Sequence, residues 1–223
     1  MPELLLKIYR IFFGALIIVA IGVQFVYSFG KPDFNFINFF SYFTILTNLL
    51  AAGLFLLLGL GAVKQKKINN FRGAAVVYLL VTGIVYWLFL ANSPEKNQLV
   101  FPWINSVLHK IMPVAVFIDW LWDPPKTKTK INILLYWLVF PFIFLGYSLI
   151  RGWIINWYPY PFLNLALQGY KNVFCYCLGI FTIISLTALL VIFIGNKLFL
   201  LEFKRGKKWG HHLPCDKGHH MMI

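Results

Sequence analysis

Hydrophobic and polar positions alternate in long blocks along this chain of 223 residues. Six apolar blocks, each close to or longer than the ~20 residues that a helix needs to cross a bilayer, are separated by short polar or charged connections. The pattern predicts an all-α polytopic membrane protein, with six transmembrane helices in one bundle over residues 1–200 and a basic, His-rich tail at 201–223. The predicted membrane helices cover residues 8–29, 36–63, 73–94, 103–122, 131–150 and 172–197.

Composition agrees with this class. Hydrophobic residues make up 60% of the chain and charged residues 12%, so the apolar surface exceeds what one soluble core could bury. The first apolar block follows Lys7 and Arg10, as in a signal peptide, but it ends without the small-x-small pattern of a cleavage site. We interpret it as a retained signal anchor.

The distribution of basic residues predicts the orientation in the membrane. The net charge is +13, and in the six-helix arrangement Lys and Arg split 15 to 5 between the two sides. Both termini fall on the richer side, which the positive-inside rule assigns to the cytoplasmic face of a plasma or inner membrane. The excess positive charge is explained by its role in orienting the helices in the membrane and by attraction to anionic lipid headgroups. We therefore predict no nucleic-acid partner.

The fourth block, Trp103–Trp122, carries polar groups that are costly in hydrocarbon. They are Asn105, His109, Lys110 and Asp119. Ionisable residues inside a membrane span are usually retained for a function. His109 is therefore the candidate reaction centre.

A second group of polar residues follows one face of the second block. Ser41, Thr44 and Asn48 recur at helical spacing, with Thr47 one step aside. Such a stripe should face other helices. Two interpretations are open, because hydroxyl and amide groups in membranes often hold helices together or bond to their own backbone, and they can also line a site.

The two groups are predicted to lie at the same depth. Thr44 lies eight residues into the second block and His109 six residues into the fourth, both counted from the outer face. At ~1.5 Å per residue they are ~12 Å and ~9 Å deep. We therefore expect a hydroxyl and an imidazole in the outer half of the bilayer.

A threonine hydroxyl beside an imidazole is suited to acyl transfer. The hydroxyl is too weak an acid to attack an ester alone, and imidazole, with a pKa near neutrality, can take its proton. Asn48, Asn105 and Arg151 are candidates for stabilising the oxyanion. Asp119 lies ten residues from His109, or ~15 Å along a helix, so it cannot complete a triad.

Other chemistries have less support in the sequence. His109 is the only His in a predicted span, whereas transmembrane haem carriers usually need several axial His ligands. Neither GxSxG nor HExxH occurs. The tail holds four His and Cys215 within ten residues, enough donors for a metal, but on a segment with no fixed scaffold. We predict no metal and no cofactor.

The segment at 152–170, between the last two blocks, is aromatic and is interrupted by Pro159 and Pro161. Its Trp and Tyr content is typical of the membrane interface. We predict that it lies as a cap or re-entrant loop over the outer mouth of the bundle.

Three motifs carry a family resemblance: FFSYFTILTNLL at 39–50, PWINSVLHKIMPVAVFIDW at 102–120 and YPYPFLN at 158–164. In this order, the chain resembles the androgen-induced and androgen-dependent TFPI-regulating protein family and its prokaryotic multi-pass relatives. The resemblance implies a membrane hydrolase of fatty acid esters of hydroxy fatty acids. By motif, its threonine nucleophile corresponds to Thr44 and its essential histidine to His109.

The chain also departs from that family. Where animal members have acidic residues after the threonine and after YPFL, this chain has Thr47 or Asn48 and Asn164. The polar network, and with it the substrate, is expected to differ. Tyr160 and Asn164 of the third motif are further candidates for contacting substrate or oxyanion, and Thr47 is an alternative nucleophile.

Three functions are compatible with the sequence. The leading hypothesis is an intramembrane hydrolase of lipid esters, with substrate entering sideways from the outer leaflet and residues 158–164 as a lid. The alternative is a non-catalytic lipid or small-molecule binding or transport protein that uses the same cavity. The third is a structural membrane partner without a ligand, in which Thr44 and His109 would lie far apart.

Overall fold

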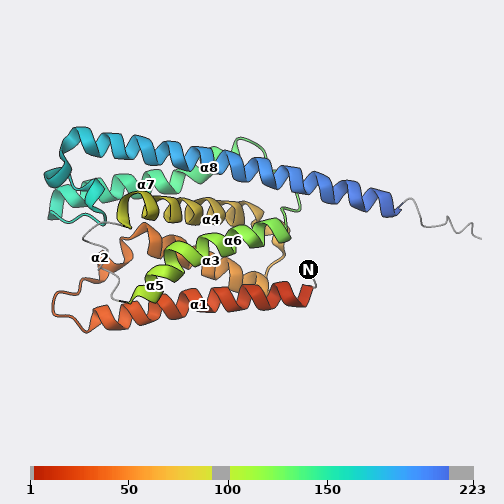
Figure 1. The fold of residues 1–223 in the computed structure, drawn as a ribbon, viewed down its shortest axis with the longest axis horizontal. Helices are drawn as coiled ribbons and strands as arrows, with labels where there is room; N and C mark the ends of the chain where they lie inside the picture. Colours follow the sequence, from red (N-terminus) through yellow and green to blue (C-terminus); the bar gives the residue numbers. More distant parts are fainter. Residues whose placement is uncertain (1–2, 92–100, 211–223) are drawn as a thin grey trace, which may run out of the picture.

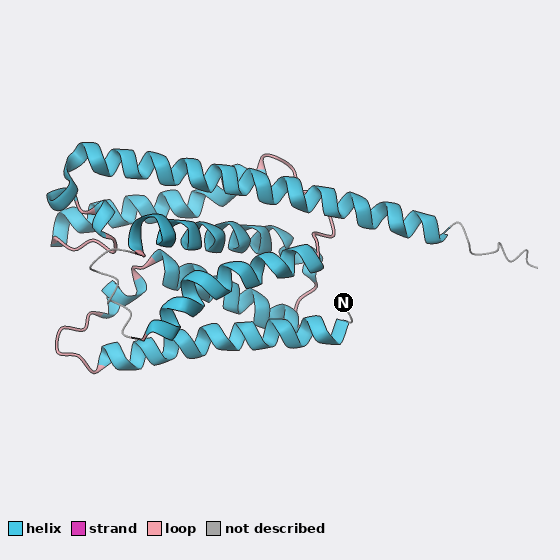
Figure 2. Ribbon diagram, viewed as in Figure 1, coloured by secondary structure: helices cyan, strands magenta, loops and turns pink. Residues whose placement is uncertain are grey.

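A computed structural model describes residues 3–91 and 101–210, with side chains up to residue 204. The described part of the chain is helical and contains no strand (Figures 1 and 2). Its α-helices are α1 (Glu3–Phe29), α2 (Phe36–Phe40), α3 (Phe43–Gly59), α4 (Gln65–Val85), α5 (Pro102–Ser106), α6 (Met112–Trp122), α7 (Ile133–Ile155) and α8 (Leu165–Gly210). Two π-helical segments, Tyr86–Leu90 and Val107–Ile111, extend α4 and join α5 to α6, and Pro161–Leu163 forms a 3₁₀ turn.

Five of these helical segments are long and apolar enough to cross a membrane: Glu3–Phe29, Gln65–Leu90, Pro102–Trp122, Ile133–Ile155 and Leu165–Lys204. The apolar helix α3 is shorter, with 17 residues, or ~26 Å at the usual rise. A multi-pass membrane protein is thus supported, while six crossings stay a prediction.

The second predicted membrane helix, 36–63, is not continuous, and this corrects the sequence interpretation. The Asn35 side chain accepts a hydrogen bond from Asn38 N–H and so begins α2, and the chain turns at Ser41, whose N–H bonds to the Asn38 carbonyl. Tyr42 is extended, and α3 begins at the next residue. Thr44 therefore lies in the first turn of a helix, whereas the depth count had placed it eight residues into one.

Other helix boundaries also differ from the predicted ones. α4 begins at residue 65 instead of 73, and α7 continues to residue 155 instead of ending at 150. α8 begins at Leu165 rather than residue 172, contains a break at Gly169, where φ is +73°, and continues to Gly210. Part of the predicted tail is therefore helical, and the His-rich segment 211–223 lies outside the described residues.

Helix α4 is at the centre of the bundle, with α7 and α8 on one side and α3 and α6 on the other (Figure 1). Helices α1 and α3 pack closely at small residues. A Cβ on Gly59 would lie 3.1 Å from the Lys7 carbonyl oxygen, and one on Gly14 would lie 3.3 Å from that of Ala52. Small residues allow such close approach of helices in membranes, where packing replaces the hydrophobic effect between helices.

A buried charge network joins α1, α4 and α6 at one end of the bundle. Arg10 Nε donates to Asp119 Oδ1 at 2.6 Å and its Nη2 donates to Asp123 Oδ2 at 2.7 Å, while Arg72 Nη2 donates to Asp119 Oδ2 at 2.6 Å. Burial alone would raise the pKa of Asp123, but Arg72, Arg10 and Lys126 hold it below its ordinary value. The sequence analysis had counted both arginines among the basic residues beside the membrane helices that determine the orientation in the membrane.

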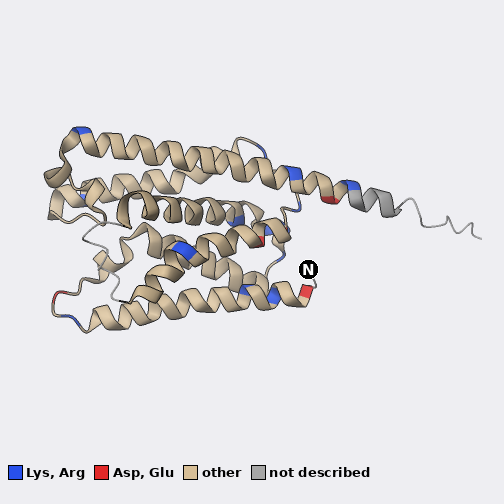
Figure 3. Cartoon of the chain, viewed as in Figure 1, with Lys and Arg blue, Asp and Glu red and all other residues tan. Residues whose placement is uncertain are grey.

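Both described ends of the chain, the start of α1 and the far end of α8, lie toward the same end of the bundle (Figure 1). Most Lys and Arg residues of the described part also lie toward that end, and few lie at the other (Figure 3). This asymmetry agrees with the positive-inside pattern. The assignment of that end to the cytoplasm stays a prediction.

The buried network predicts a large stability effect at Asp119. Asp119→Ala removes the carboxylate shared by Arg10 and Arg72 and leaves both guanidinium groups short of a partner in the interior. We expect a loss of about 3–5 kcal/mol of folding free energy, measured as a lower thermal unfolding midpoint in detergent. The control is Glu3→Gln, which removes the exposed partner of Lys7 and should leave the midpoint unchanged. Equal midpoints for the two variants would contradict the role of the network.

Candidate active site

Thr44 and His109 come together from two separate helices. Thr44 Oγ1 lies 3.2 Å from His109 Nε2. Both side chains are buried, with 7% and 8% of their surface exposed. The structure thus brings the two candidate catalytic residues within hydrogen-bonding distance, in contrast to the separation expected of a purely structural protein.

The surroundings of His109 determine which ring nitrogen carries the proton. Its Nδ1 lies 3.2 Å from the backbone oxygen of Asn105. A carbonyl oxygen can only accept a hydrogen bond, so Nδ1 must be the donor, and in the neutral ring Nε2 is then the acceptor. The Thr44 hydroxyl therefore donates to Nε2. This is the arrangement that a general base requires.

A local π-helix orients His109. Within Val107–Ile111 the backbone bonds run from residue i+5, as from Met112 N–H to the Val107 oxygen. The next bond of that series would need an N–H from Pro113, which proline lacks. Asn48 Nδ2 replaces it by donating to the Leu108 oxygen at 3.3 Å. π-helical segments of this kind occur frequently at functional sites.

Asn48 also fixes the position of Thr44. The same Nδ2 donates to the Thr44 carbonyl oxygen at 2.9 Å, and the residue is fully buried. Asn48 therefore ties the helix that carries the hydroxyl to the helix that carries the imidazole. These two hydrogen bonds give Asn48 a positioning role, and its predicted contact with an oxyanion stays a prediction.

Tyr86 is a site residue that the sequence analysis did not identify. Its ring stacks on the imidazole of His109, with centroids 4.6 Å apart, and its hydroxyl accepts a hydrogen bond from Asn105 Nδ2 at 3.0 Å. The Asn105 amide is thus directed to Tyr86, while its backbone oxygen orients His109. The only signal in the sequence was an aromatic residue in an apolar block, which usually indicates packing.

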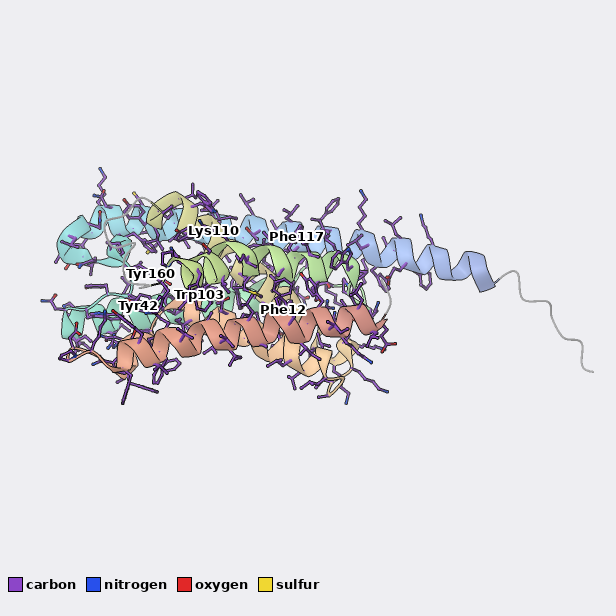
Figure 4. All side chains as sticks on the ribbon, turned by 60° about the horizontal axis from the view of Figure 1, so that its bottom comes forward. Phe12, Tyr42, Trp103, Lys110, Phe117 and Tyr160 are labelled. Carbon is purple, nitrogen blue, oxygen red and sulfur yellow. The ribbon has the colours of Figure 1, made fainter. Side chains whose placement is uncertain are left out.

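Tyr160 reaches the site from the segment between α7 and α8. Its hydroxyl oxygen accepts a hydrogen bond from Thr44 N–H at 3.3 Å and lies 3.4 Å from Thr44 Oγ1. Its ring lies 5.8 Å from that of Tyr42, and Figure 4 shows the two side chains in the same region of the bundle. Burial raises the pKa of Tyr160, so the phenol keeps its proton and remains a hydrogen-bond donor.

The side chains of three other candidates bond elsewhere than to the Thr44 hydroxyl or the His109 ring. Thr47 donates to the Phe43 carbonyl oxygen at 2.9 Å, the usual back-bond of a helical threonine. The Asn164 side chain accepts hydrogen bonds from two N–H groups at the start of α8, so it caps that helix. Arg151 donates to Asn38 Oδ1 and lies over the Trp157 ring. The role of Thr47 as a nucleophile and the roles of Asn164 and Arg151 as oxyanion contacts stay predictions.

Two cavities of different character meet at Thr44. A polar chamber of about 370 Å³ is lined by His109, Asn105 and side chains from α1 and the following loop. A smaller apolar groove of about 110 Å³ lies between α3, α4, α7 and α8, and Phe43, Leu138 and Phe181 are among its lining residues. Thr44 and Tyr160 line both. The hydroxyl of Thr44 thus lies at the boundary between polar and apolar space.

Comparisons of the chain with protein-family models, with curated proteins and with solved structures found no match. The family resemblance therefore rests on the three motifs alone. Among the described residues there is no cluster of three or more His, Cys, Asp or Glu side chains that could hold a metal ion.

The role assigned to Asn48 predicts that its removal weakens the fold. Asn48→Leu keeps the size of the side chain but leaves the buried Leu108 oxygen without its donor. We expect a loss of about 1–3 kcal/mol, measured as a lower thermal unfolding midpoint in detergent. Asn172→Leu, at an exposed position of α8, is the matched control and should not change the midpoint. No difference between the two variants would exclude the bridging role.

Proposed function

We propose that this protein is an intramembrane hydrolase of lipid esters, with Thr44 as nucleophile and His109 as general base. One observation carries the proposal: a buried hydroxyl within hydrogen-bonding distance of an imidazole nitrogen lies where a polar chamber meets an apolar groove. An ester of a fatty acid has the same two halves. Its acyl chain suits the groove, its alcohol suits the chamber, and the carbonyl carbon then lies beside Thr44.

In the first step, Thr44 Oγ1 attacks the ester carbonyl carbon while its proton passes to His109 Nε2. The carbonyl oxygen becomes an oxyanion. When this tetrahedral intermediate collapses, the bond from carbon to the alcohol oxygen breaks, and His109 returns the proton to that oxygen. The products of this step are the free alcohol and an acyl ester on Thr44.

Stabilisation of the oxyanion is assigned to Tyr160 and to the start of α3. Because the Thr44 hydroxyl donates to His109, the Tyr160 hydroxyl is the donor in its contact with Thr44 Oγ1. Its hydrogen can turn from there to the negative charge that develops on the neighbouring carbonyl oxygen. Thr44 is the second residue of α3. The positive end of the helix dipole therefore lies at the reacting oxygen, where it favours negative charge.

In the second step, a water molecule from the polar chamber hydrolyses the acyl enzyme. His109 takes a proton from the water, whose oxygen attacks the acyl carbon, and then returns the proton to Thr44 Oγ1 as the carbon–oxygen bond breaks. Fatty acid leaves and the free hydroxyl is restored. The chamber that receives the alcohol thus also supplies the water.

Access for the acyl chain is proposed from the side, between α7 and α8. The groove is lined by Phe142 and Phe181, which are 54% and 39% exposed on the surface of the bundle. A chain longer than the groove can therefore extend into lipid. Residues 158–164 place Tyr160 against Thr44 and bury Phe162 beside the groove, a position consistent with the proposed lid.

The proposed mechanism predicts loss of ester hydrolysis in Thr44→Ala and His109→Ala. Removing a nucleophile or its base should lower turnover of a fluorogenic fatty acyl ester in detergent by about 10²–10⁴-fold. Thr44→Ser keeps a hydroxyl at the same position and is the matched control, with hydrolysis retained. A fluorophosphonate probe should label the wild type and not Thr44→Ala.

Unchanged rates in both alanine variants would end the hydrolase proposal. Co-purification of an intact ligand, together with failure of the probe to label Thr44, would favour the alternative of a non-catalytic lipid-binding or transport protein.

The groove makes a separate prediction that uses two neighbouring cysteines. Cys177 lines the apolar groove, whereas Cys175 is exposed on the outer surface of α8. Cys177→Trp should fill the groove and lower kcat/KM for a long-chain ester about tenfold or more, equivalent to at least ~1.4 kcal/mol. Cys175→Trp is the control and should have little effect. The same loss in both variants would show that the groove does not hold the acyl chain.

A further inference from the structure

Gln24 on α1 is a buried polar residue in the wall of the polar chamber, and the proposed chemistry does not use it. It is 3% exposed. Its Nε2 donates to Ser28 Oγ at 3.2 Å, and its Oε1 has no partner in the described part of the chain. A buried amide oxygen without a hydrogen-bond partner lowers the free energy of unfolding by about 1–3 kcal/mol. A polar ligand group that bonds to this oxygen would remove that cost.

The geometry of Gln24 favours a hydroxyl as that ligand group. The Ser28 hydroxyl can donate or accept, so it satisfies either end of the Gln24 amide. In both orientations one end of the amide stays without a partner. A ligand hydroxyl, which is both donor and acceptor, can pair with either end.

The charges around the chamber favour a neutral ligand. Among its lining residues, Lys31 and Asp33 carry opposite formal charges that sum to zero, and Lys31 also lies over the ring of Tyr27. Arg151 is not among the lining residues, although its guanidinium group donates to Asn38 and lies over Trp157, which are. With a neutral His109, the lining has no net charge with which to attract an anion.

We propose that the chamber binds the alcohol half of an acyl ester of a small neutral polyol, such as glycerol, and that Gln24 hydrogen-bonds to a free hydroxyl of that alcohol. This inference rests on the proposed hydrolase and names its substrate class. It differs from fatty acid esters of hydroxy fatty acids, whose alcohol half is a long apolar chain with a carboxylate. Polar side chains line much of the chamber. A long apolar alcohol half would remove water from these side chains without forming hydrogen bonds to them.

The test compares three esters of one fatty acid in detergent: the monoacylglycerol, the methyl ester, and an ester of a hydroxy fatty acid. We expect wild type to prefer the monoacylglycerol by kcat/KM. Gln24→Leu should lower the ratio of monoacylglycerol to methyl ester by about tenfold to a hundredfold, the effect of losing one buried hydrogen bond. Gln168→Leu, outside both cavities, is the control and should keep the wild-type ratio.

Two results would overturn the polyol assignment while leaving the hydrolase intact. One is a wild-type preference for the carboxylate-bearing ester. The other is an unchanged ratio in Gln24→Leu with hydrolysis still dependent on Thr44.

A binding experiment separates failure of catalysis from failure of recognition. A non-hydrolysable monoalkylglycerol ether should raise the thermal unfolding midpoint of wild type and of Thr44→Ala, because a ligand that binds the folded state stabilises it. The shift should be lost in Gln24→Leu. If wild type hydrolyses none of the esters yet shows the shift, the hydrolase proposal fails and the polyol site stands. If the ether gives no shift, the polyol site fails.

Discussion

Pro113 has no N–H to give to the helix that carries His109, and the arrangement of the site depends on that missing donor. In hydrocarbon a carbonyl without a partner costs several kcal/mol, so the protein must supply a donor from elsewhere. Asn48 does so from α3. The bond that repairs one helix thereby fixes its distance to the other, and the π-helical turn beside it directs the imidazole toward Thr44. The hydrogen bond from Asn48 therefore both satisfies the Leu108 carbonyl and fixes the geometry of the site.

The membrane character of the fold could be predicted from the sequence because several apolar blocks of spanning length in one chain rarely occur outside a bilayer. Interruptions within a block were harder to predict. Residues 36–63 form one apolar run in the sequence, and only the Asn35 cap and the turn at Ser41 divide it. The burial of Arg10 and Arg72 was missed for a different reason. Basic residues near helix ends are expected from topology alone, so nothing in the pattern pointed to the interior.

Counting depth placed Thr44 and His109 at one level, since helices crossing the same slab share a depth scale. That count assumed continuous helices, and it could not give the rotation of each helix about its own axis. The break before α3 and the π-helical turn determine this rotation. Tyr86 gave no signal, because stacking on a histidine depends on tertiary packing. The capping role of Asn164 was not predicted, because an asparagine beside a functional motif and one that caps a helix look alike in sequence.

Charge is handled differently at the two ends of the bundle. At one end, Arg10 and Arg72 pair with Asp119 and Asp123, and Lys126 also pairs with Asp123. Removing one partner would leave an unpaired charge in the interior. Around Thr44 and His109 the contacts are neutral, and a backbone oxygen orients the imidazole where a soluble hydrolase would use a carboxylate. A neutral pair is less costly to bury than an ionic one. In the proposed mechanism, charge arises only during the reaction, and Tyr160 and the start of α3 are in place to stabilise it.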